Sequence, residues 1–447
     1  MPRHARDPSR PVLPVAVACA LTSLALVGAA GVAAAQGTTE LAVPVGVPTV
    51  AGAYTVLPEP PGTRTAAPAP TPVAQPVPSV TDAALSIVAA GDVLPHLPVL
   101  RSARDGDGYD FGRLLDPLDP WVQGADLALC HLEVPVAPAG SAPSGYPVFG
   151  APAPLAQGLA DQGWDGCSTA SNHAVDRGWR GVGATLDALD AAGLGHAGTA
   201  RSAAEDAQPQ LYRLERGGRP VTVAHLAATY GTNGMPVDAD KPWSVRLLDA
   251  EDVVERATAA RDAGADVVLV SLHWGTEYRT TPTDAQRVVA ARLADSGVVD
   301  LVIGHHAHVP QPVEQLPGGP GGTGMWVAYG LGNYLSNQDE ACCSPATAAG
   351  LLLTAQVTVP GTGPGAGAPT GPARVTGVQW TPVTVDRRAG HRVHALAEIA
   401  AGTATLDAAV VARRLAAVRD AAGPQAPERL VPAGATGPAP QVVRRTP

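Results

Sequence analysis

The stretch LVIGHHAHVP, residues 301–310, places three histidines within four positions directly after an apolar run. The apolar run has the length and the aliphatic composition of a buried strand. A strand that only fills a core needs no imidazole, so the histidines indicate a site at the end of this strand. The same arrangement, an apolar run that ends in polar side chains, recurs along the chain and predicts both the fold and the site.

Short aliphatic runs alternate with segments of helical periodicity from Ala84 onward, which is typical of an α/β domain. Helices are predicted from about Arg180 to Gly193, over residues 250–263 with Asp249 as N-cap, and over residues 405–422. The Gly/Pro-rich residues 361–372 are typical of a flexible hairpin insertion. Strands are predicted at residues 84–92, 125–133, 221–229, 265–273, 299–306, 325–332, 351–359 and 373–385.

Composition divides the chain into four parts. Residues 1–35 begin with arginines, continue through an apolar stretch and end in small residues, which is typical of an export signal; the length of the stretch, residues 11–35, also fits a retained membrane anchor. Residues 36–82 are rich in Pro and Ala and predict a stiff spacer. Residues 83–422 form the predicted domain, and residues 423–447 are expected to be a disordered tail. The domain is therefore expected outside the cell or in the envelope, with membrane contact only through an uncleaved N-terminal segment.

Charge and cysteine content exclude some classes of protein. The net charge is −10, and no basic cluster in the foldable part would neutralise a row of phosphates, which argues against a nucleic-acid-binding protein. Cys130, Cys167, Cys342 and Cys343 lack the spacing of a zinc site. They would be free to oxidise after export, and the sequence leaves their pairing open.

Polar side chains able to bind a metal follow almost every predicted strand. Each one alone is more readily explained as a turn residue, a helix N-cap or a core histidine. Together they indicate one site, because loops at the carboxyl ends of strands in α/β sheets converge on one crevice. Carboxylates, an amide and imidazoles without thiolate suit Zn, Mn or Fe, and two such ions bridged by a carboxylate would activate a water. These residues are Asp92, His96, Glu133, Asn172, His173, His273, His305, His306 and His308.

Six motifs in this order resemble the CapA family of bacterial poly-γ-glutamate capsule biosynthesis proteins, whose fold is similar to calcineurin-like metallophosphoesterases. The resemblance covers about residues 86–335 and implies a four-layer αββα sandwich with two divalent metal ions. The motifs are Gly91-Asp92 with His96, Leu132-Glu133, Ser171-Asn172-His173 with Asp176, His273-Trp274-Gly275 with Glu277 and Tyr278, Gly304-His305-His306 with His308, and Gly332-Asn333-Tyr334.

The resemblance also implies roles for individual residues. The metal ligands would be Asp92, His96, Glu133, Asn172, His273, His306 and His308. His173, as an acid, and His305 would be the catalytic residues. Substrate would contact Asp176, Trp274, Glu277, Tyr278 and Asn333.

The chain departs from the family pattern at three places. Three residues separate Asp92 from His96 where metallophosphoesterases have one. His131 stands where the family has an asparagine, and this either adds a ligand to the implied set or weakens the match. The third histidine of residues 305–308 leaves open which two of the three coordinate a metal.

Three functions fit these motifs. The first is an exported metal-dependent protein that acts in synthesis, release or anchoring of an anionic surface polymer such as poly-γ-glutamate, in contact with a membrane polymer-synthase complex. The second is a non-catalytic accessory or polymer-binding subunit, and the third is a general exported phosphoesterase. Because nearly all motif residues are present, the sequence favours a metal-dependent hydrolase, although fold alone assigns no substrate.

Overall fold

Two β-sheets form the centre of the fold in the computed structural model, which describes residues 81–361 and 370–447. All of these residues belong to one compact unit, Val73–Pro447. The predicted export segment, residues 1–35, and nearly all of the predicted spacer, residues 36–82, lie outside the described residues. Within the described ranges, no helix is long and apolar enough to cross a membrane.

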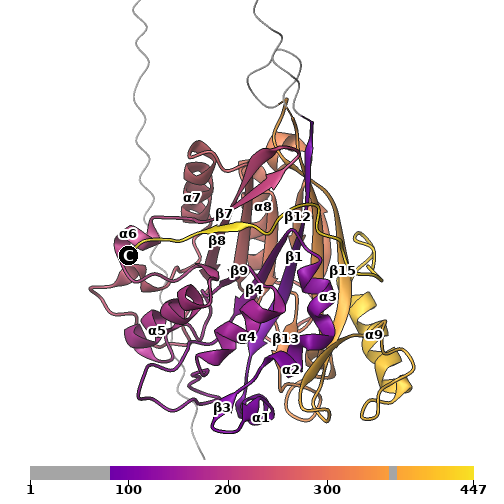
Figure 1. The fold of residues 1–447 in the computed structure, drawn as a ribbon. Helices are drawn as coiled ribbons and strands as arrows, with labels where there is room; N and C mark the ends of the chain where they lie inside the picture. Colours follow the sequence, from indigo (N-terminus) through magenta and orange to yellow (C-terminus); the bar gives the residue numbers. More distant parts are fainter. Residues whose placement is uncertain (1–80, 362–369) are drawn as a thin grey trace, which may run out of the picture. The chain divides into compact units, whose positions relative to one another are not determined.

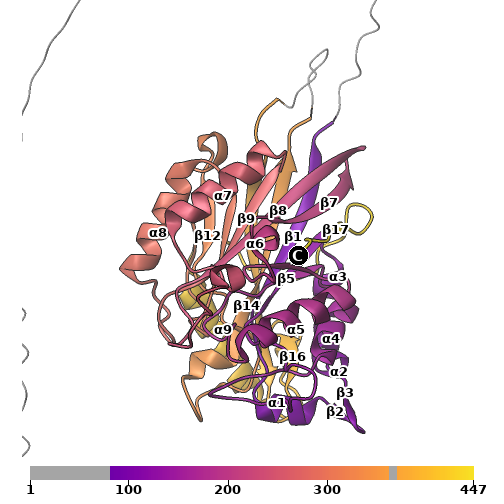
Figure 2. The same cartoon turned by 90° about the vertical axis from the view of Figure 1, so that its left-hand side faces the viewer.

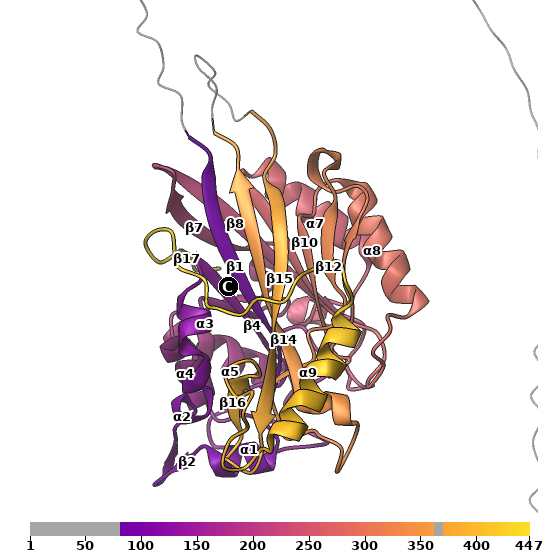
Figure 3. The same cartoon turned by 90° about the vertical axis from the view of Figure 1, so that its right-hand side faces the viewer.

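The sheets have eight and seven strands, and they are visible from two sides in Figures 1 and 3. The first sheet runs in the order β16 (Arg392–Ala395), β15 (Arg374–Asp386), β14 (Ala349–Val359), β1 (Ala83–Leu94), β4 (Leu127–Leu132), β5 (Gly166–Ser168) and β6 (Gly195–Ala197), with β13 (Asn333–Ser336) also paired to β1. The second sheet runs in the order β11 (Val313–Leu316), β12 (Met325–Ala328), β10 (Leu301–His305), β9 (Val267–His273), β8 (Arg219–Thr229), β7 (Gln210–Arg216) and β17 (Gln441–Val443).

The layers follow from what each face of each sheet buries. Apolar side chains from both sheets, such as Ile87 of β1 and Leu269 of β9, share one core between the sheets. The outer face of the first sheet packs against α1 (Leu97–Ser102), α2 (Gly112–Leu115), α3 (Asp119–Gln123), α4 (Pro154–Gln162) and α5 (Gly178–Ala191). The outer face of the second sheet packs against α7 (Ala250–Asp262) and α8 (Asp284–Ser296). Figure 2 shows the two helix layers on opposite sides of the sheets, which confirms the expected αββα sandwich.

The central strands are buried along their whole length because both of their faces are covered. Every residue of β4, β9 and β10 is buried, as expected for strands between a second sheet and a helix layer. β1, β4, β5 and β6 run parallel in the first sheet, and β8, β9, β10 and β12 run parallel in the second. Side chains at the carboxyl ends of several strands are thereby brought together.

The predicted helices are present with small shifts at their ends. α7 begins after Asp249, whose carboxylate accepts a hydrogen bond from the backbone N–H of Glu251, as its N-cap position predicted. The predicted closing helix is α9 (Ala408–Ala422), which adds Val411 and Val418 to the core between the sheets. The first predicted helix is α5, which starts two residues before Arg180.

The C-terminal segment, residues 423–447, is ordered, and the prediction of a disordered tail is wrong for it. Its residues Gln441–Val443 form β17, which pairs with the edge strand β7. The buried Arg445 guanidinium donates hydrogen bonds to His196 Nδ1 at 2.8 Å and to the Thr199 carbonyl at 2.6 Å. A segment rich in Pro and Ala is not expected to form a core of its own. This tail is ordered because it pairs with a free sheet edge of the domain and places Arg445 in a buried polar pocket.

Candidate metal centre

Asp92 lies at an irregular point of β1, and this irregularity aims its side chain. The pairing of β1 with β4 changes register just before Asp92, and the pairing of β1 with β13 changes register just after it. Gly91 permits the shift, because a Cβ at this position would lie 2.0 Å from the Gly332 carbonyl oxygen. A bulge of this kind redirects a side chain, and here it turns the Asp92 carboxylate toward the histidines that follow β10.

The Asp92 carboxylate lies close to three residues of the turn formed by residues 305–308. His308 Nδ1 lies 3.0 Å from Asp92 Oδ2, and His305 Nδ1 lies 3.4 Å from Asp92 Oδ1. The backbone N–H of His306 also points at Asp92 Oδ1, at 3.4 Å. His306 and His308 have positive φ angles of 85° and 58°, which are costly for histidine and are typical of strained functional turns.

Glu133 lies between the side chains of two histidines, His273 and His308. Its Oε1 is 3.7 Å from His308 Nε2 and 3.9 Å from His273 Nε2. His273 Nε2 in turn lies 2.9 Å from the side-chain oxygen of Asn172. One carboxylate oxygen therefore faces both histidines, so Glu133 is placed where it could contribute to a metal centre together with them.

Three sets of ligand atoms lie close enough to hold a metal ion. The sets share members, so they describe one connected centre rather than separate sites. They are Asp92 with His131 and His273, Asp92 with Glu133 and His308, and Glu277 with His306 and His308.

Several buried polar atoms of this centre have no hydrogen-bond partner among the described residues. They include both oxygens of Glu133, both ring nitrogens of His305 and Nδ1 of His306. Glu133 is fully buried, and an unpaired buried carboxylate is unfavourable without a cation. The donor set of carboxylates, imidazoles and an amide therefore fits divalent metal ions.

The ionisation of the centre also fits metal ligands. Burial lowers the pKa of His273 well below its usual value, and it lowers the pKa of His306 to about 3. Both rings are therefore neutral and have a lone pair to offer. Burial alone would raise the pKa of Asp92, but the neighbouring rings of His305 and His308 hold it well below the usual value. Burial raises the pKa of Glu133 well above that of an exposed glutamate.

His173 lies beside the centre and is oriented by Asp176. His173 Nδ1 donates to Asp176 Oδ2 at 2.7 Å, and the same oxygen accepts the backbone N–H of Phe149 at 2.7 Å. His173 Nε2 lies 3.5 Å from Asn233 Nδ2, and both residues line a pocket over the centre. The expected substrate contact Asp176 thus orients His173, because its side chain is buried and committed to these two bonds.

The predicted ligand His96 and the predicted substrate contact Trp274 have other partners. His96 turns back to the chain, with its Nδ1 donating to the Leu94 carbonyl at 3.0 Å and its ring edge against Phe149. It lines the pocket but belongs to none of the ligand sets found among the described residues. Trp274 is a core residue, because it is buried and its indole N–H donates to the Tyr329 carbonyl.

The remaining predicted substrate contacts lie around the pocket. Glu277 and Tyr278 line it and are exposed. Asn333 is buried beneath it, and its side-chain amide donates to Gln338 Oε1 at 3.0 Å and to the Thr347 carbonyl at 2.9 Å. Asn333 therefore supports the wall residue Gln338 and has no open path to substrate.

His131 was absent from the predicted ligands, yet it lies inside the centre. Its Nε2 is 3.0 Å from His273 Nδ1 and its ring stacks on His305 with centroids 3.9 Å apart. Its position at the end of β4, two residues before Glu133, was a signal for this location. Asn233 lies on the loop that follows β8, outside the six motifs, and was not predicted.

Known proteins are similar in sequence to parts of this chain. The family model described as bacterial capsule synthesis protein PGA_cap matches residues 86–338. The chain is 32% identical over 181 residues to the PGA biosynthesis protein CapA of Bacillus subtilis, covering 40% of this chain and 44% of that protein. It is 29% identical over 283 residues to a probable polyglutamine synthesis accessory protein of Mycobacterium tuberculosis, covering 55% of this chain and 70% of that protein. The chain thus spans less than half the length of the Bacillus protein.

Among solved structures, the calcineurin-like phosphoesterase YfkN of Bacillus subtilis has a TM-score of 0.39 and 14% identity, covering 76% of this chain and 96% of that chain. The 5'-nucleotidase precursor of Thermus thermophilus has a TM-score of 0.36 and 17% identity, covering 65% of this chain and 54% of that chain. Both likenesses are remote. The sequence match spans more than half of the chain and includes every motif that supplies the centre. The chain therefore belongs to the bacterial capsule synthesis protein family PGA_cap.

Proposed function

We propose that this chain is an exported, metal-dependent hydrolase that acts on a cell-surface polymer such as poly-γ-glutamate during its synthesis, release or anchoring. The observation that carries the proposal is Glu133, a fully buried carboxylate with unpaired oxygens between His273 and His308. The printed names of the relatives support the polymer. The Cys130–Cys167 disulfide between β4 and β5 supports export, because disulfides persist mainly in oxidising compartments.

Two divalent ions of zinc, manganese or iron would be held by the residues that converge on Glu133. When bound, such ions lower the pKa of a bound water and stabilise an oxyanion. The ligands would be Asp92, Glu133, Asn172, His273, His306 and His308, with His131 as a further candidate.

His173 would supply the proton that a leaving group needs. Asp176 accepts a hydrogen bond from Nδ1–H, which directs Nε2 of the same ring toward the pocket. The bond from the Phe149 N–H fixes Asp176, so the ring has one orientation relative to the centre. A positioned imidazole of this kind is a typical general acid.

Metal content tests the proposal directly. We expect about two transition-metal equivalents per full-length chain by elemental analysis, as in dinuclear hydrolases. The variants Asp92→Ala and His273→Ala should hold less metal, because each removes a ligand. The control His394→Ala changes a partly exposed histidine of β16 away from the centre and should hold as much metal as the unmodified chain.

The outcome also separates the candidate functions. A folded, metal-supplemented chain without metal would refute the hydrolase and leave a polymer-binding accessory role. A loaded chain that turns over phosphodiesters and leaves γ-glutamyl polymers intact would be a general phosphoesterase. Hydrolysis or transfer on the polymer would support the proposal as stated.

Metal uptake should release at least one proton per chain near pH 7. Burial alone would lower the pKa of His308, but the charges of Glu133 and Asp92 raise it to about 9, so the metal-free chain holds a proton on this ring. A metal ion must displace that proton to bind the ring. Calorimetric titration in two buffers of different ionisation enthalpy measures the release, which should fall above about pH 9. Equal heats in both buffers at pH 7 would contradict a ligand role for His308.

A further inference from the structure

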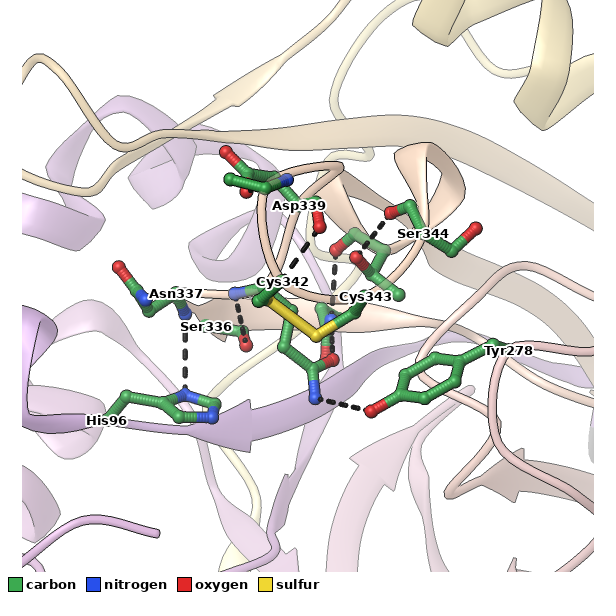
Figure 4. The surroundings of a disulfide bond; sticks show 12 residues. His96, Tyr278, Ser336, Asn337, Asp339, Cys342, Cys343 and Ser344 are labelled. Atoms are coloured by element: carbon green, nitrogen blue, oxygen red, sulfur yellow. Dashed lines mark hydrogen bonds between the residues drawn. A yellow bond between two sulfur atoms is a disulfide. The ribbon is translucent and has the colours of Figure 1, made fainter. Parts of the chain in front are cut away.

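A pocket of about 660 Å³ lies over the metal centre. His173, Asp176 and His308 contribute to its lining on the side of the centre. Its walls come from loops that are far apart in sequence, residues 146–149 and residues 337–343 among them. Figure 4 shows one wall, in which the Cys342–Cys343 disulfide lies near Tyr278 and His96. A substrate that reaches the centre must therefore pass these walls.

The described walls contain no lysine or arginine side chain. None of the described residues that line the pocket is lysine or arginine, and two of them, Asp176 and Glu277, are carboxylates. Positive charge for an anion would therefore come from the metal ions and the histidines on the side of the centre, and not from lysine or arginine in the other walls. A run of negative charges along the walls would find no counter-charge among these residues.

Arg279, which directly follows Tyr278, is exposed and is not among the residues that line the pocket. Two further arginines close to the walls are bound elsewhere. Arg177 donates to the carbonyls of Phe149 and Ala142, each at 3.0 Å, and so holds the loop that forms one wall. Arg387 pairs with Asp339 behind the disulfide. These guanidinium groups shape the pocket and are not aimed into it.

The walls present apolar and aromatic surface instead. Val148 and Tyr278 are 41% and 39% exposed, and Tyr146 is 76% exposed. Phe149 and Met235 line the same pocket. Exposed apolar side chains that gather around a cavity are typical of a ligand site.

We propose that this pocket binds an uncharged, partly apolar part of the substrate, next to a single anionic group that faces the metal centre. The inference rests on the proposed function and narrows its substrate. Successive free carboxylates inside the pocket would lose water beside Asp176 and Glu277 with no cation in the walls to replace it. On a polymer such as poly-γ-glutamate, the centre then acts at an end or at an attachment to an uncharged group, and not along the run of carboxylates.

Two ligands that differ only in charge test this inference. Calorimetry on the metal-loaded full chain compares two γ-linked glutamate oligomers of the same length. The first has all of its α-carboxylates, and in the second these are carboxamides, so that only the terminal carboxylate remains. We expect the amidated oligomer to bind at least tenfold more tightly. Phenylphosphonate, an apolar group with one anionic group, should bind and compete with it.

A matched pair of variants locates the effect. Val148→Lys adds a positive charge to a partly exposed wall position, so it should raise the affinity for the polyanionic oligomer several-fold. Val288→Lys adds the same charge at a 69% exposed position of α8 outside the pocket lining, and it should leave that affinity unchanged.

Each other outcome has a definite meaning. Tighter binding of the polyanionic oligomer, with an affinity that falls as salt rises, would overturn the inference. Binding of phenylphosphonate without binding of either oligomer would also overturn it, while leaving the metal centre in place. A chain that binds neither metal nor phenylphosphonate would refute the proposed function itself.

Discussion

Glu133→Gln should stabilise the metal-free chain and remove its response to metal. The Glu133 carboxylate is fully buried, and neither oxygen has a hydrogen-bond partner among the described residues. Burial raises its pKa in the folded chain above the value of 4.5 expected for an unfolded one. The folded chain therefore binds a proton more tightly than the unfolded chain, so Glu133 destabilises the metal-free fold increasingly as pH rises above about 4.5. An uncharged amide of the same size removes this penalty.

The metal-loaded chain should behave in the opposite way. A metal ion at about 1,000 times its dissociation constant stabilises the folded chain by about 4 kcal/mol, and the variant should lose most of this gain. Turnover should fall by at least about 10²–10³-fold, the usual loss on removal of one electrostatic element of a catalytic site. Thermal unfolding with and without metal, together with a phosphoester assay, measures both effects.

Glu255→Gln is the matched control, because Glu255 is an exposed glutamate of α7. It should change neither the unfolding temperature of the metal-free chain nor the response to metal. A Glu133→Gln chain that is less stable without metal, and that still gains stability from metal, would show that the carboxylate serves the fold. The role as a metal ligand would then be wrong.

The position of the centre was predictable from the sequence, because parallel strands bring their carboxyl ends together. Asp92, Glu133, His273 and the histidines of residues 305–308 all follow or end apolar runs, and the structure gathers them. Their exact partners were not predictable. The bulge at Asp92 depends on the close approach of β1 to Gly332, a contact between segments some 240 residues apart.

Residues whose role depends on side-chain direction were the hardest to assign. His96 and Trp274 stand next to ligand motifs, yet one bonds to its own backbone and the other packs into the core. His131 appeared as a departure from a family pattern, and its contact with His273 requires the two sheets to meet. Composition likewise misjudged the C-terminal tail, because its order comes from β7 and from a buried polar pocket that its own sequence does not contain.

His173→Ala should lower turnover by about 10²–10⁴-fold, the usual contribution of a general acid or base, while metal content stays unchanged. The ring lies in the pocket beside the centre and belongs to none of the described ligand sets, so its loss should affect proton transfer and not metal binding. Asp176→Asn should have a smaller effect and alter the pH dependence of turnover, because the ring keeps a neighbour but loses the carboxylate that fixes its Nδ1–H. Metal analysis and pH–rate profiles of the two variants distinguish these effects.

His96→Ala supplies the comparison that gives the His173 result its meaning. Both histidines line the same pocket, so each substitution removes an imidazole from its lining. His96 already donates from Nδ1 to the Leu94 carbonyl, and burial lowers its pKa to about 4, so it is neutral at pH 7 and has no acidic proton to give. Its loss should leave metal content intact and turnover within a few-fold of the unmodified chain. Loss of metal from His96→Ala would mean that this ring rotates into the centre when ions bind. The ligand set implied by the family resemblance, which includes His96, would then be correct even though the ring points away in the metal-free chain.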